Sequence, residues 1–133
     1  MIKEDYVSFE TAKLLKEKGF NAECRAAYTN YGKLFTTQIQ QYITNIICSK
    51  GILWDCTAPT LQMACKWLRE VHNLSAEVYR TACGYIGCIV AIPSGTDIKF
   101  LEEDGDDLPS GTYTKWEYAC EATLKYALEN LIK

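Results

Sequence analysis

The feature that most constrains the fold is a pair of short turns, each set between two strand-like stretches. The first turn covers residues 30–33 and the second covers residues 82–84. The flanking stretches alternate residue by residue or are rich in apolar side chains, as strands are. Strands joined by so short a turn pair antiparallel. We therefore predict two hairpins, the second extended by one more strand at 97–101, and exclude a doubly wound parallel sheet.

Three other stretches repeat apolar residues every three or four positions, which is typical of amphipathic helices. They cover residues 9–18, 58–72 and 116–131. The predicted order is helix, hairpin, helix, hairpin with its extra strand, helix. The fold class is therefore α+β, with an antiparallel sheet of four to five strands and three amphipathic helices packed on one face. The other face is left to water or to a partner.

Residues that favour helix ends support two of these helices. Ser8 is an N-cap residue in front of the first helix, and Gly19 is placed to end it in a left-handed conformation. In front of the last helix, Thr114 and Glu117 have the spacing of a capping box. We therefore expect the first helix to begin after Ser8 and the last to begin after Thr114.

The central helix carries the only histidine of the chain, His72. Thr57 or Thr60 is placed to cap its start. The helix dipole at its carboxyl end favours the imidazolium form, which suits a residue that ends a helix better than a neutral general base. We therefore expect His72 to be structural rather than catalytic. The apolar residues expected to face the sheet are Leu61, Cys65, Leu68 and Val71.

The chain has the size and composition of one globular domain, residues 1–133. It is 48% hydrophobic and 23% charged, as ordinary soluble proteins are. Residues 38–55 are harder to interpret, because isoleucines and a tyrosine at helical spacing are also strong strand formers. We treat 38–55 as an insertion of uncertain structure.

The net charge and the amino-terminal residues limit the classes of partner and the cell compartment that we expect. The net charge is −3, so no strong positive field attracts nucleic acid or an anionic membrane, and we expect neither as a partner. The chain has no apolar run long enough for a membrane span and no apolar signal-peptide core at its start. We expect a cytoplasmic protein.

The cysteines predict neither a disulfide framework nor a zinc site. Their number is odd, no two have C-x-x-C spacing, and the chain has one histidine. We expect reduced, mostly structural thiols. The seven are Cys24, Cys48, Cys56, Cys65, Cys83, Cys88 and Cys120.

No recognisable catalytic or metal-binding pattern is present either. The acidic run 102–107 lacks the ligand spacing of a calcium loop. There is no nucleophile elbow, phosphate-binding glycine loop or paired-carboxylate motif. We expect no catalytic residue, no metal and no cofactor.

The uncovered sheet face is a more informative candidate for a functional site than any catalytic or metal-binding motif. If Ile86, Cys88 and Val90 point at the helices, Tyr85 and Ile89 point away and give an outer face that is apolar for its position. Such a face suits an oligomer contact or a ligand, although scattered exposed apolar residues are also normal. The binding candidates, on the sheet and beside the central helix, are Arg25, Tyr79, Tyr85, Arg69 and Trp67.

Three blocks of sequence occur in a distinctive order: YVSFETAKLLKEKGF, then APTLQMACKWLREVH, then the closing TYTKWEYACEATLKYALENLI. In this order they resemble a group of small proteins encoded by phages and mobile elements of gut Bacteroidota. The resemblance implies a setting, a phage or prophage accessory protein in the bacterial cytoplasm. It carries over no catalytic residue.

These observations lead to three hypotheses of different classes. The first is a non-enzymatic binding protein, homo-oligomeric, that antagonises or modulates a host defence process by binding a host protein or a small nucleotide ligand. The second is a small hydrolase acting on a nucleotide or peptide, which requires a pocket that gathers His72 or a thiol with carboxylates. The third is a structural or virion-associated oligomer.

Overall fold

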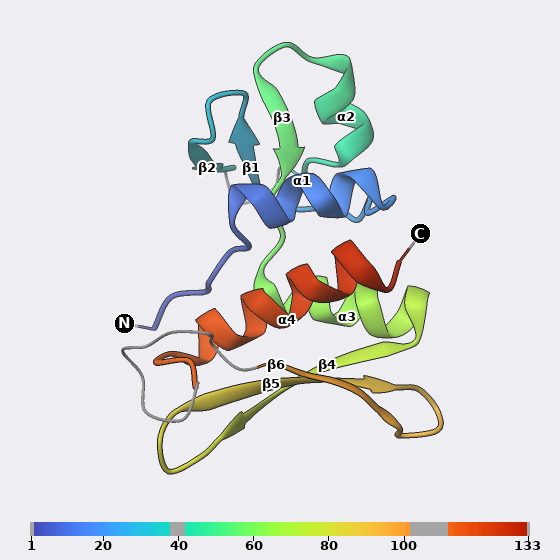
Figure 1. Ribbon diagram of the computed structural model, residues 1–133. Helices are drawn as coiled ribbons and strands as arrows, with labels where there is room; N and C mark the ends of the chain where they lie inside the picture. The colour runs from blue at the N-terminus through green and yellow to red at the C-terminus, as the bar shows by residue number, and fades with distance from the viewer. Residues whose placement is uncertain (1, 38–41, 102–111, 133) are drawn as a thin grey trace. The chain divides into compact units, whose positions relative to one another are not determined.

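The computed structural model describes residues 2–37, 42–101 and 112–132 (Figure 1). These residues form two compact units, one ending at Met63 and the other covering Ala64–Ile132. The elements in chain order are α1 (Phe9–Glu17), β1 (Ala26–Thr29), β2 (Leu34–Thr36), α2 (Asn45–Lys50), β3 (Trp54–Thr57), α3 (Leu61–His72), β4 (Leu74–Arg80), β5 (Tyr85–Ala91), β6 (Asp97–Leu101) and α4 (Trp116–Asn130).

The α+β class and the antiparallel pairing are confirmed, but the prediction of one sheet covered by three helices is wrong. The described residues form two three-stranded sheets, ordered β2-β1-β3 and β4-β5-β6, together with four helices. The reason is the position of β3. It pairs with β1 on the side opposite β2, with Ala27 opposite Thr57, and so completes a sheet within the first unit.

The first helix begins and ends as predicted. The Ser8 side chain accepts a hydrogen bond from the Thr11 backbone N–H at 3.2 Å, and Gly19 follows the helix with a φ of 96°. Leu15 of α1 is fully buried, and Phe20, after the turn, is almost so. This burial secures α1 in the core of the first unit.

Residues 42–57 belong to the first unit through α2 and β3. The side chain of Asn45 is buried, donates to the Phe20 carbonyl at 2.6 Å and accepts from the Thr57 N–H at 2.9 Å. This amide therefore connects α2 both to β3 and to the residues that follow α1. Whether 38–55 is an insertion stays a prediction, and residues 38–41 lie outside the described part.

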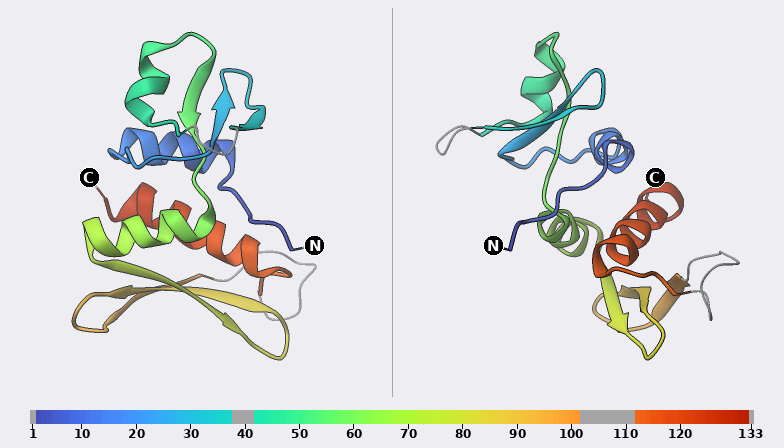
Figure 2. Two further views of the ribbon diagram at one scale, coloured as in Figure 1. Left: turned by 180° about the vertical axis from the view of Figure 1, so that it is seen from behind. Right: turned by 90° about the vertical axis from the view of Figure 1, so that its left-hand side faces the viewer.

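In the second unit, α4 packs on one face of the β4-β5-β6 sheet (Figure 2). Gly87 of β5 lies so close to α4 that a Cβ on it would be 1.9 Å from the Thr123 hydroxyl. Ile89, two residues on, is fully buried. Alternation places Gly87 and Ile89 on the helix-facing side, so the expectation that Ile86, Cys88 and Val90 face the helices is wrong. Glycine at position 87 carries no side chain to mark the buried face in the sequence.

The closing helix starts later than its sequence signal suggests. Its N-cap is Lys115, and no side chain makes a capping hydrogen bond there, so the predicted capping box of Thr114 and Glu117 is wrong. The apolar stripe itself is confirmed. Its buried members are Ala119, Cys120, Thr123, Leu124, Ala127 and Leu128.

The central helix is shorter than its sequence block but capped at one of the two predicted positions. Thr60 accepts from the Met63 N–H at 3.2 Å. Leu61, Cys65 and Leu68 are buried as expected, whereas Val71 is 56% exposed and does not belong to the core. None of the helices in the described ranges combines the length and apolarity needed to cross a membrane.

Candidate functional site

The candidate site is built around Arg25, one residue before β1. An antiparallel bridge between Cys24 and Ile43 holds two segments together here, with both backbone hydrogen bonds between 2.7 and 2.8 Å. The bridge places Tyr42 beside Arg25. The guanidinium donates to the Tyr42 hydroxyl at 3.0 Å and lies 5.3 Å from the centre of the ring, a cation–π distance.

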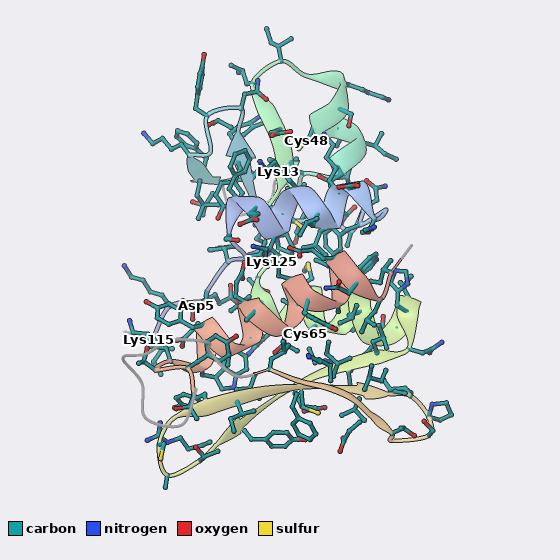
Figure 3. All side chains as sticks on the ribbon, viewed as in Figure 1. Asp5, Lys13, Cys48, Cys65, Lys115 and Lys125 are labelled. Atoms are coloured by element: carbon teal, nitrogen blue, oxygen red, sulfur yellow. The ribbon has the colours of Figure 1, made fainter. Side chains whose placement is uncertain are left out.

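The amino-terminal segment forms a second wall of the site. Tyr6 bridges to Thr60, and the Leu61 N–H donates to the carbonyl of Asp5 at 2.9 Å; Asp5 is labelled in Figure 3. Tyr28 of β1 also holds this segment, because its buried hydroxyl donates to the Val7 carbonyl at 2.6 Å. The segment is therefore tied both to the start of α3 and to β1.

These segments line a partly open cavity of about 220 Å³, which we call the Arg25 pocket. Its lining combines one cation, two carboxylates, two phenols and an apolar floor. The lining residues are Glu4, Tyr6, Glu23, Cys24, Arg25, Tyr42, Ala58, Pro59, Thr60 and Met63. All of them belong to the first unit.

The charges of the pocket favour recognition over nucleophilic chemistry. Tyr42 and, more weakly, Glu4 raise the pKa of Arg25 above its ordinary value, so it is a permanent cation. The one thiol of the lining is Cys24, whose pKa burial raises to about 11. A thiol that holds its proton at neutral pH is a poor nucleophile. The pocket can pair its guanidinium with a carboxylate and its carboxylates with donors of a ligand.

Tyr79 and Tyr85, the other candidates predicted on the sheet, lie in the second unit and on opposite faces of its sheet. Tyr79 pairs with Ile86, and Tyr85 pairs with Arg80. Tyr79 is 47% exposed, whereas the half-buried Tyr85 has the Arg80 guanidinium 5.0 Å from its ring centre. The structure thus does not bring Arg25, Tyr79 and Tyr85 onto one sheet face.

The candidates on α3 belong to the second unit, whereas Arg25 belongs to the first. Arg69 is exposed, and the half-buried Trp67 packs edge-on against the ring of His72, with 4.7 Å between the ring centres. His72 is the last residue of α3, as predicted. Its Nε2 is buried and has no hydrogen-bond partner among the described residues.

A second, more open hollow of about 450 Å³ lies between the end of α1 and α2. Its lining includes Lys16 and Lys50 beside Phe20 and Ile46. The Lys16 ammonium is already bound to the Asp55 carbonyl at 2.5 Å. Lys16 is therefore already engaged within the first unit.

Sequence reasoning identified Arg25 but missed Tyr42, Tyr6 and the two glutamates of the pocket. Tyr42 reaches Arg25 only because Ile43 pairs with Cys24, and no short-range pattern signals a single isolated bridge.

Comparisons with protein-family models, with curated proteins and with solved structures found no match for this chain.

Proposed function

We propose that this chain is a small non-enzymatic binding protein of phage or prophage origin that antagonises or modulates a host defence process. In this proposal it works in the bacterial cytoplasm and holds a segment of a host protein in the Arg25 pocket. The genomic setting is supported by the resemblance of its three sequence blocks. The binding role is supported by the pocket.

The mixed lining of the pocket is the observation that carries the proposal. Arg25 offers a fork of donors for a carboxylate, and Glu4 and Glu23 offer acceptors for amide or ammonium groups. Pro59 and Met63 add apolar surface. A protein segment carries acidic, basic and apolar groups close together, as this lining requires. A nucleotide fits less well, because two carboxylates repel its phosphates.

Self-association is part of the same proposal. Exposed apolar side chains on strands of both sheets support it, and such surface is typical of contacts between copies or with a partner. They are Leu34, Phe35, Ile98 and Phe100.

Photo-crosslinking inside the bacterial host tests the binding role. Met63 lines the pocket, so we would replace it with photo-reactive benzoylphenylalanine and compare it with the same replacement at Tyr31, which is 97% exposed and outside the pocket. We expect a protein adduct of defined mass at position 63 and not at position 31. Arg25→Ala should lower the adduct yield at least several-fold, whereas Lys33→Ala, which removes an exposed cation of the same unit, should not.

Equal adducts at both positions, or an adduct at position 63 that Arg25→Ala leaves unchanged, would contradict the proposal. Native mass spectrometry of protein purified from the same cells separates the alternatives. A retained small molecule with no protein adduct would favour the nucleotide ligand, and the same spectra report whether the chain self-associates.

A further inference from the structure

Two thiols of the second unit lie in contact with each other. The Sγ atoms of Cys65 and Cys120 are 3.6 Å apart and hydrogen bonded. Cys65 belongs to α3 and is labelled in Figure 3, and Cys120 belongs to α4. Both side chains are buried, Cys65 slightly less than Cys120. The contact between α3 and α4 therefore includes two sulfur atoms that can form a covalent bond with each other.

We propose that Cys65 and Cys120 are a redox-active thiol pair that closes into a disulfide between α3 and α4 when the protein meets hydrogen peroxide. A disulfide has an S–S distance of about 2.05 Å, so the two sulfurs must approach by about 1.5 Å. The two sulfurs already face each other, so the change is a closing of an existing contact.

The surroundings assign different roles to the two sulfurs. The hydrogen bond with Cys120 is the largest effect on the pKa of Cys65 and lowers it, burial opposes it by less, and the charge of Arg69 adds a still smaller lowering. The pKa of Cys120 is raised, first by its bond to Cys65 and then by burial. Cys65 is therefore the more readily ionised thiol of the pair and reacts first, and Cys120 is the thiol that resolves the product.

The reaction balances with peroxide as the only oxidant. The Cys65 thiolate attacks one peroxide oxygen, the O–O bond breaks, and the departing hydroxide takes up a proton to become water. Cys65 is then a sulfenic acid. The Cys120 sulfur attacks the Cys65 sulfur, the S–O bond breaks, and the hydroxyl leaves as water with the proton of the Cys120 thiol. Two thiols lose two electrons in total, and one hydrogen peroxide becomes two waters.

Four other buried thiols serve as internal controls, because burial raises the pKa of each of them. They are Cys24, Cys48, Cys56 and Cys88. A thiol that keeps its proton is a slow nucleophile toward peroxide. Selective oxidation of the Cys65–Cys120 pair is thus a property of its geometry and surroundings, and not of burial in general.

The test uses the full chain carrying Cys83→Ser, which removes the exposed thiol and with it disulfides between molecules. The reduced, folded protein is treated with hydrogen peroxide, denatured, alkylated and digested. Mass spectrometry should find a peptide that joins Cys65 to Cys120, while the four control thiols are recovered alkylated. In a second variant that adds Cys120→Ser, dimedone should trap sulfenic acid on Cys65.

Recovery of both Cys65 and Cys120 in alkylated form, at peroxide exposures that modify Cys83 in the unaltered chain, would overturn the proposal. So would a disulfide that joins either of them to a different cysteine. The peptide map of the Cys83→Ser protein decides the matter even if the Cys120→Ser variant does not fold. The result is independent of the proposed function, because it makes no use of the Arg25 pocket.

Discussion

At the scale of single residues, a buried hydrogen bond from Tyr28 holds the amino-terminal segment. We expect Tyr28→Phe to lower the free energy of unfolding by about 1–2 kcal/mol, since the Val7 carbonyl loses its buried donor. Chemical denaturation measures the loss. Tyr31→Phe is the matched control, because Tyr31 is almost fully exposed and its change should stay within about 0.5 kcal/mol. Equal effects of the two variants would show that the Tyr28 bond contributes little.

Residue-scale signals were also where sequence reasoning succeeded best. Ser8, Gly19 and Thr60 act at helix ends as expected, because capping depends on residues within one turn of each other. Thr114 is the exception. Its spacing to Glu117 matches a capping box, but the helix begins one residue later than that box requires. A short motif predicts a helix end only when the backbone around it is free to adopt the cap.

At the scale of elements, the packing of α4 on β5 depends on the missing side chain at Gly87. A Cβ there would meet both the hydroxyl of Thr123 and, at 3.3 Å, the carbonyl of Ala119. We expect Gly87→Ala to destabilise the protein by at least about 2 kcal/mol, because α4 or β5 must shift. Urea denaturation measures this.

A double variant and a control make that prediction specific. Gly87→Ala combined with Thr123→Ala should cost less than the sum of the two single changes, because the second removes the nearest clash. Gly51→Ala should be close to neutral, since its nearest atom is 4.0 Å away and its φ is −101°. Strict additivity in the double variant would mean that the clash is not what destabilises Gly87→Ala.

Element-scale prediction from sequence was good for local pairs and poor for distant ones. The hairpins β1–β2 and β4–β5 and the strand β6 were predicted because each involves neighbours in the chain. The pairing of β3 with β1 joins segments that are far apart in sequence, and no pattern in Trp54–Thr57 specifies which strand it meets. The same limit hid the bridge that brings Tyr42 to Arg25. Part of the candidate site therefore depends on contacts that a pattern of spacing does not encode.

At the scale of the whole molecule, the buried thiols are expected to make the free energy of unfolding depend on pH in the alkaline range. The pKa of Cys24 is raised to about 11 and that of Cys56 to about 12, both chiefly by burial, whereas a thiol in the unfolded chain has a pKa near 9. Between pH 9 and 12 the unfolded chain therefore binds fewer protons than the folded protein. The free energy of unfolding must fall as the pH rises through this window, and is unaffected by these thiols below it.

Urea denaturation between pH 7.5 and 10.5 measures this fall. Tyrosines and lysines also titrate in this range, so cysteine variants are needed to isolate the contribution of the buried thiols. Cys56→Ala should make the fall shallower even if it lowers stability at neutral pH. Cys83→Ala, at an exposed thiol, should leave the slope unchanged. An unchanged slope in Cys56→Ala would exclude this thiol as a source of the pH dependence.

The outer edge of β3 affects where a further strand could join this sheet. Its Thr57 N–H is taken by the amide of Asn45, and its Asp55 carbonyl is taken by the Lys16 ammonium, so two side chains occupy the groups that another strand would use. β2 ends the same sheet on the other side, with Leu34, Phe35 and Thr36 all exposed. Among the described residues, a further strand is therefore hindered from pairing at β3, whereas β2 has no strand on its outer side.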